Sequence, residues 1–134
     1  KKQKSGSIII TSSTAGIFGL SHHSPYVTSK WGVICLMKSL AIELGSYNVK
    51  VNAICPGSVE GERLEKVIEA EVKSKGMTRD KIYQAYSEGT SMKKLIHPND
   101  IADMALFLSS SKSRLVSGQV IAVDGNTEVP DPKF

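Results

Sequence analysis

The 134-residue sequence lacks the features that define several protein classes. Its two cysteines, Cys35 and Cys55, fall in no Cys-x-x-Cys or Cys/His cluster, which favours reduced thiols in a cytoplasmic protein. No apolar run is long enough for a membrane-spanning helix or a signal peptide, so we expect no membrane association. Aromatic residues make up 6% of the chain and do not alternate with the lysines. Despite the net charge of +4, we therefore expect no nucleic-acid partner.

What the sequence does contain is an alternation of short apolar runs with helical patterns, as in α/β proteins. The β-branched run 7–11 predicts a buried parallel strand, and residues 49–53 predict a second strand before the Pro56-Gly57 turn. Apolar spacing predicts helices over 25–44, with Gly45 as C-cap, and over 98–108, followed by a last strand over 120–123. Residues 58–94 are charged, with only broken helical periodicity around 64–72 and 79–87.

Tyr26 and Lys30 lie four residues apart at the start of the first predicted helix. With Ser24 as N-cap and Pro25 at the first helical position, Tyr26 falls in the first turn, where the helix dipole favours an anion. Positions i and i+4 share a helix face, so the Lys30 ammonium can approach the Tyr26 phenol and favour its ionised form. Ser13 follows the first strand, at the edge where open α/β sheets bind ligands. These three residues suggest proton transfer at an alcohol or carbonyl.

Several strings, in order along nearly the whole chain, resemble the later half of a classical short-chain dehydrogenase/reductase. They are Gly6-Ser7-Ile8-Ile9-Ile10-Thr11-Ser12-Ser13-Thr14-Ala15-Gly16, Tyr26-Val27-Thr28-Ser29-Lys30, Val51-Asn52-Ala53-Ile54-Cys55-Pro56-Gly57, His97-Pro98-Asn99-Asp100-Ile101-Ala102, Leu106-Phe107-Leu108 and Ser117-Gly118-Gln119-Val120-Ile121-Ala122-Val123-Asp124-Gly125.

The resemblance implies an α/β fold, the later half of a Rossmann-type doubly wound parallel sheet, with residues 1–134 as a single partial domain. The sequence does not begin with methionine and has no glycine-rich phosphate-binding turn. We therefore expect the N-terminal dinucleotide-binding half to be absent, together with the residue that chooses the cofactor and the catalytic asparagine. Within the domain, residues 58–94 would form a mobile substrate lid. The complete protein would be a homodimer or homotetramer, with a partner-facing stripe of Val33, Met37 and Leu40.

The resemblance also implies roles for individual residues. Tyr26 would exchange a proton with the substrate oxygen, Lys30 would assist it and bind the nicotinamide ribose, and Ser13 would hold the substrate oxygen. The cofactor-binding residues for NAD or NADP would be Tyr26, Lys30, Pro56, Gly57, Ser58 and Val59. Family members often carry a threonine a few positions after the glycine, whereas Gly61 here supplies no hydroxyl.

The implied function is an oxidoreductase that interconverts a small-molecule secondary alcohol and a ketone by hydride transfer with NAD(P)(H). An alternative is a truncated, non-catalytic chain that keeps the catalytic residues without its own cofactor-binding half. Adjacent His22 and His23 have no third ligand at metal-binding spacing, so we expect a substrate-facing or surface role and no metal. A hydrolase triad of Ser13, His22 and Asp100 or Asp124 is disfavoured because no Gly-x-Ser-x-Gly elbow occurs.

Overall fold

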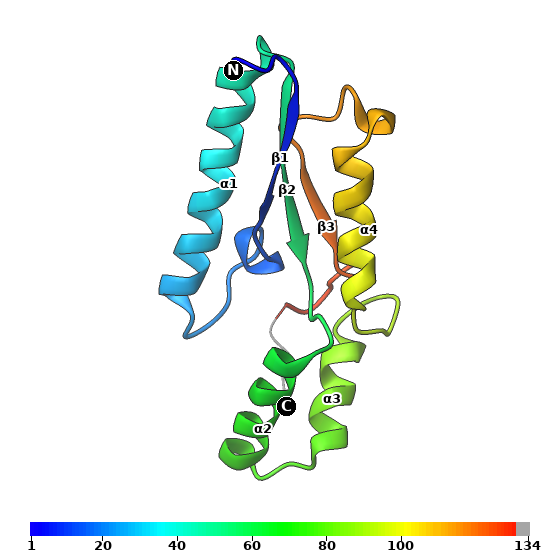
Figure 1. Ribbon diagram of the computed structural model, residues 1–134. Helices are drawn as coiled ribbons and strands as arrows, with labels where there is room; N and C mark the ends of the chain where they lie inside the picture. The colour runs from blue at the N-terminus through cyan, green and yellow to red at the C-terminus, as the bar shows by residue number, and fades with distance from the viewer. Residues whose placement is uncertain (131–134) are drawn as a thin grey trace.

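A three-stranded parallel sheet forms the centre of the computed structural model, which describes residues 1–130. Its strands are β1 (Gly6–Thr11), β2 (Val49–Pro56) and β3 (Val120–Val123), in the order β1-β2-β3. β2 runs three residues beyond the predicted strand because Ile54, Cys55 and Pro56 pair with β3. Parallel pairing brings the carboxyl ends of all three strands to one edge, next to α2 (Glu62–Lys75) and α3 (Arg79–Glu88) (Figure 1).

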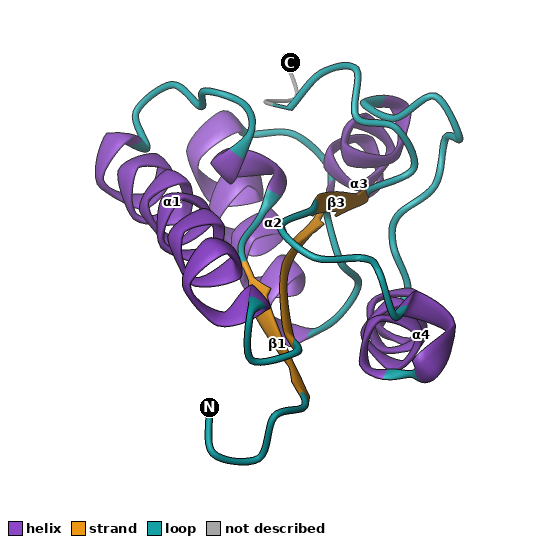
Figure 2. Ribbon diagram, turned by 90° about the horizontal axis from the view of Figure 1, so that it is seen from above, coloured by secondary structure: helices purple, strands orange, loops and turns teal. Residues whose placement is uncertain are grey.

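Helices α1 (Ser24–Gly45) and α4 (Pro98–Ser109) flank the sheet on opposite sides (Figures 1 and 2). The main core lies between α1 and β2, where Ile34 and Met37 pack against Val49, Val51 and Ala53. β2 is buried along Val51–Cys55 because it has a strand on each side and a helix over each face. The predicted α/β architecture is therefore confirmed.

Three expectations for α1 were wrong. Ser24 is the first helical residue and His23 the N-cap, without a side-chain cap, so Pro25 takes the second helical position. Gly45 is the last helical residue and Ser46 the C-cap, and the left-handed conformation falls on Asn48 instead. Met37 is fully buried against the sheet, so it cannot face a partner.

The connection between α4 and β3 is fixed by polar groups of β2. Buried Asn52 donates from Nδ2 to the Val116 carbonyl (2.8 Å) and accepts from the Gln119 amide (3.0 Å). The Val51 amide donates to Ser117 Oγ (3.1 Å). Residues 51–52 and 116–119, which are far apart in the sequence, thus form one hydrogen-bonded unit that sets the register of β3.

Helices α2 and α3 form a small unit with a hydrophobic cluster of its own around Leu64, Ile68 and Ile82. Arg79 from α3 pairs with the Glu65 carboxylate of α2 (2.6 Å). Residues 58–94, expected to show only broken helical periodicity, therefore contain two complete helices. No helix within residues 1–130 has the length and apolarity needed to span a membrane.

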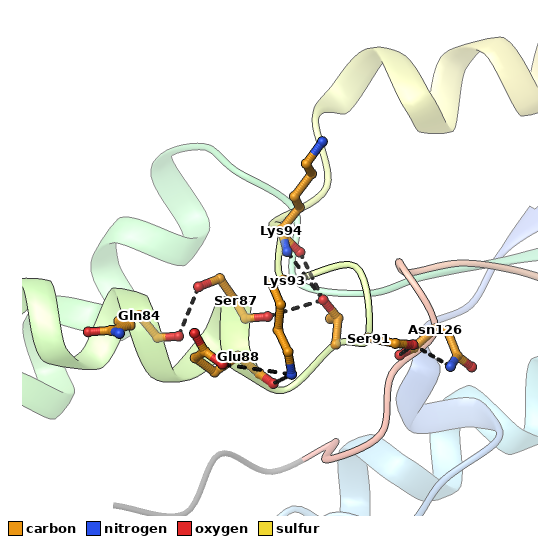
Figure 3. A network of polar contacts seen from close by, with 8 residues as sticks. Gln84, Ser87, Glu88, Ser91, Lys93, Lys94 and Asn126 are labelled. Atoms are coloured by element: carbon orange, nitrogen blue, oxygen red, sulfur yellow. Dashed lines mark hydrogen bonds and ion pairs between the residues drawn. The ribbon is translucent and has the colours of Figure 1, made fainter.

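Polar contacts join the end of α3 to the residues after β3 (Figure 3). Lys93 Nζ donates to the Glu88 backbone oxygen (2.8 Å) and pairs with the Glu88 carboxylate (3.7 Å). Asn126 Nδ2 donates to Ser91 Oγ, which in turn donates to the Asn126 carbonyl (3.2 Å). The Ser91–Asn126 pair thereby connects the residues after α3 with those after β3.

Candidate functional site

Two serines follow β1, and the structure gives them different contacts. Ser12 is buried, and its hydroxyl donates to the Lys30 backbone oxygen (2.9 Å), which ties the strand end to α1. Ser13 is half-buried and is the N-cap of a 3-10 turn, Thr14–Gly16, because its Oγ accepts from the Ala15 amide (3.1 Å). The Ser13 hydroxyl hydrogen is not used in that contact, so it can still be donated.

Tyr26 and Lys30 face each other at the same edge of the sheet. Tyr26 is the third residue of α1, and the Lys30 ammonium lies 5.6 Å from the centre of its ring. Lys30 Nζ also donates to the Thr11 carbonyl at the end of β1, at a long 3.4 Å. No hydrogen bond joins the Tyr26 hydroxyl to another group of residues 1–130. The structure therefore brings Lys30 against both Tyr26 and the strand that leads to Ser13.

A third residue, Arg63, reaches Tyr26 from the first turn of α2. Its guanidinium lies 5.7 Å from the centre of the Tyr26 ring. The sequence analysis did not single out Arg63, because a charge in an irregular segment carries no signal of which helix it will contact. The Tyr26 ring thus has two cations beside it, one from its own helix and one from α2.

The residues after β2 form a close-packed loop. The Gly57 amide donates to the Val123 carbonyl (3.1 Å), and a Cβ on Gly57 would lie 2.9 Å from the Asp124 Cβ and 3.0 Å from its Cα. Glycine is therefore needed here for close approach of two backbones. The Ser58 carbonyl accepts from the Ile96 amide (3.0 Å), and Val59 forms a bridge with Ile96.

Asp124 lies directly against Gly57 of this loop. The residue is buried, with 8% of its surface exposed, and its carboxylate accepts from the amides of Asn126 and Thr127, both at 3.1 Å. Thr14, Gly57 and Ser58 line one small cavity of about 20 Å³, so the ends of β1 and β2 lie side by side. Gly61, at φ 138°, is the N-cap of α2. That left-handed conformation accounts for glycine where family members often have threonine.

Cys55 and the histidines have no catalytic arrangement. Burial raises the pKa of the Cys55 thiol, which makes it a poor nucleophile. His22 has a positive φ of 59°, and His23 Nδ1 donates to the Ser21 carbonyl (2.7 Å). Among residues 1–130 there is no group of three side chains placed to hold a metal ion.

Comparison with known proteins gives consistent matches along the chain. A family model described as enoyl-(acyl carrier protein) reductase matches residues 1–126. A 3-oxoacyl-[acyl-carrier-protein] reductase of Thermotoga maritima is 37% identical over 124 residues, which is 92% of this chain and 46% of that protein. The chain spans about half the length of the curated relatives it matches.

Two solved structures with bound cofactor share the fold. A 3-oxoacyl-[acyl-carrier protein] reductase from Brucella melitensis with bound NAD has a TM-score of 0.74 and 30% identity, covering 96% of this chain and 43% of that one. An actinorhodin polyketide ketoreductase with NADPH has a TM-score of 0.87 and 28% identity, covering 92% of this chain and 48% of that one.

Proposed function

This chain belongs to the short-chain dehydrogenase/reductase family, and we propose that it is the later, catalytic half of an NAD(P)-dependent oxidoreductase. The observation that carries the proposal is the Tyr26–Lys30 pair in the first turns of α1, at the carboxyl edge of a parallel sheet and beside the strand leading to Ser13. The reaction proposed is the interconversion of a small-molecule secondary alcohol and a ketone. Residues 58–94 would cover the substrate.

The order of the motifs supports assignment to the later half. The glycine-rich turn that binds dinucleotide phosphates belongs to the first half of a doubly wound sheet, and this sequence has none. Within residues 1–130, β1 pairs with β2 on one side and with no strand on the other. That free edge can accept a parallel strand from an earlier half.

The residues at the carboxyl edge fit the nicotinamide end of NAD or NADP. Lys30 offers an ammonium for ribose hydroxyls, and Pro56, Gly57, Ser58 and Val59 offer a fixed backbone with the close approach that Gly57 permits. Related structures contain NAD or NADPH, which supports either cofactor. When bound, the cofactor supplies or accepts the hydride.

The side chains of this chain would manage the proton. In reduction, the Tyr26 hydroxyl would donate its proton to the ketone oxygen as negative charge develops there, and in oxidation the phenolate would take it back. The Ser13 hydroxyl, whose oxygen already accepts from Ala15, would donate to the same substrate oxygen. The Lys30 ammonium, 5.6 Å from the centre of the Tyr26 ring, would assist Tyr26 and bind the nicotinamide ribose.

Substitution of Tyr26 tests the assignment in the complete enzyme. Tyr26→Phe should abolish turnover and leave cofactor binding nearly intact, because it removes the transferable proton and keeps the ring. Ser13→Ala should be less severe, because it removes one hydrogen bond to the substrate oxygen. Steady-state rates and fluorescence titration with NADH and NADPH measure both effects. A Tyr26→Phe enzyme with near-normal kcat would refute the assignment.

The alternative function, a truncated non-catalytic chain, differs in two properties that can be checked. Such a chain would bind neither NADH nor NADPH, and its upstream coding sequence would contain no glycine-rich turn.

Both cysteines are free thiols, which favours a reducing, cytoplasmic location for the enzyme. As in the family, we expect the complete protein to be a homodimer or homotetramer.

A further inference from the structure

Arg63 occupies a position over Tyr26 that the proposed chemistry does not by itself require. It comes from the lid, and its guanidinium stands 5.7 Å from the ring centre, at nearly the same distance as the Lys30 ammonium at 5.6 Å. Lys30 is used by the proposed proton transfer and the ribose. Because Lys30 already fills the roles that the proposed chemistry gives to a cation beside Tyr26, we expect Arg63 to have a different one.

The carboxylates closest in sequence to Arg63 are engaged by other cations. Glu62 pairs with Lys66 (2.7 Å), and Glu65 pairs with Arg79 (2.6 Å). No carboxylate in the described residues lies within 4.0 Å of the Arg63 guanidinium. Arg63 is exposed and donates no hydrogen bond within residues 1–130. Its N–H groups therefore remain available to a ligand.

Arg63 also lines an open groove. The groove lies between the loop before α1 and one face of α2, where His23, Arg63 and Lys66 line it together with the carboxylates of Glu62 and Glu71. Arg63 is the residue that connects the groove with the Tyr26 ring.

We propose that Arg63 binds an anionic group of the substrate, a carboxylate or a phosphate, a few bonds from the carbonyl that Tyr26 protonates. Its planar fork of donors matches either group in a bidentate manner. The proposal rests on the proposed function, because it assigns the substrate class of that same site.

A purely structural role for Arg63 is the competing explanation, and the chain contains a matched example of one. Arg79 stands 5.7 Å from the centre of the Tyr83 ring, the same distance as Arg63 from Tyr26. Unlike Arg63, Arg79 gives two hydrogen bonds to Glu65, at 2.8 and 2.6 Å, and links α3 to α2. Arg79 therefore has an intramolecular anion, and Arg63 lacks one among the described residues.

The test uses the complete enzyme and matched pairs of ketones. Acetoacetate is compared with its methyl ester, and dihydroxyacetone phosphate with dihydroxyacetone, so that each pair differs in one anionic group. Arg63→Met should lower kcat/KM for the anionic member that the wild type prefers by roughly 10- to 100-fold, mostly through KM. The neutral members should change by less than about threefold, and Arg63→Lys should recover part of the loss. The preferred pair distinguishes a carboxylate from a phosphate.

Two control variants separate charge and packing from recognition. Arg79→Met removes the same kind of arginine–tyrosine contact, and Lys73→Met removes a positive charge from the same helix as Arg63. Both should leave the ratio of anionic to neutral kcat/KM unchanged.

Two results would overturn the role of Arg63. They are equal losses for anionic and neutral ketones in Arg63→Met, and a wild type that prefers the neutral members. An enzyme that turns over none of the ketones with either cofactor would instead overturn the proposed function itself. If Arg63→Met turns over anionic and neutral ketones as well as the wild type does, only the inference about Arg63 is overturned.

Discussion

Lys30 makes two contacts at the carboxyl edge, one with the Tyr26 ring and one with the Thr11 carbonyl. In the proposed enzyme its ammonium acts both on the phenol and on the ribose. Lys30→Met keeps much of the side-chain length and removes the charge. Both turnover and cofactor affinity should therefore fall, because the cation beside Tyr26 and the donor to the ribose are lost together. Steady-state rates and fluorescence titration measure these effects.

Lys73→Met is a suitable control, since Lys73 is exposed on α2. It changes the net charge by the same amount and should alter neither quantity. If Lys30→Met left both kcat and the cofactor dissociation constant unchanged, Lys30 would have neither of its proposed roles.

Local spacing predicted some of the candidate residues and could not predict others. Tyr26 and Lys30 share a helix face at i and i+4, so their contact follows from helix geometry alone. Arg63 reaches the same ring from a different helix, so its contact depends on how α2 packs beside α1. The need for glycine at position 57 likewise depends on Asp124, which arrives there through the pairing of β2 with β3.

At the scale of elements, α2 and α3 are held together by a cluster separate from the core under α1. Ile68 is fully buried in the cluster between α2 and α3. Ile68→Ala should cost about 2–5 kcal/mol, and because the cluster is separate, the loss should appear as local opening. In hydrogen exchange, amides of α2 and α3 should exchange faster by at least roughly 30-fold, while those of β2 should be little changed.

Val67→Ala provides the comparison within the same helix. Val67 is 40% exposed, so its truncation should change exchange far less than that of Ile68. If Ile68→Ala accelerated exchange in β2 and in α2 to the same degree, the lid and the sheet would form one cooperative unit.

The elements themselves were largely predictable from apolar periodicity, and the errors have physical causes. The ends of α1 differ from the prediction by one residue, because Ser24 and Gly45 are both helical and the positive φ after the helix falls on Asn48. His97 caps α4, with its Nδ1 accepting from Asn99, a role not expected from the sequence. Helices α2 and α3 were predicted only as broken helical periodicity. Their few apolar residues pack into a small cluster, and most of each helix surface is polar.

At the scale of the whole molecule, α1 presents apolar side chains on the face opposite the sheet. Buried Met37 belongs to the inner face, whereas Trp31, Cys35 and Ile42 are exposed on the outer one. Exposed apolar side chains that share one face of a helix make that face a candidate for an interaction surface. We therefore expect the subunit contact of the complete protein to involve these outer residues, in place of the stripe first inferred from the sequence.

Ile42 is 84% exposed and lies in the last turn of α1, where a lysine is compatible with the helix dipole. Ile42→Lys should leave the fold intact and place an unpaired charge in the proposed contact, which is costly when buried. The mass of the complete protein measured by light scattering should fall to that of a smaller assembly. Leu115→Lys is the control, because Leu115 is 82% exposed and lies outside α1. An unchanged mass in Ile42→Lys, or an equal loss in both variants, would show that α1 does not form the contact.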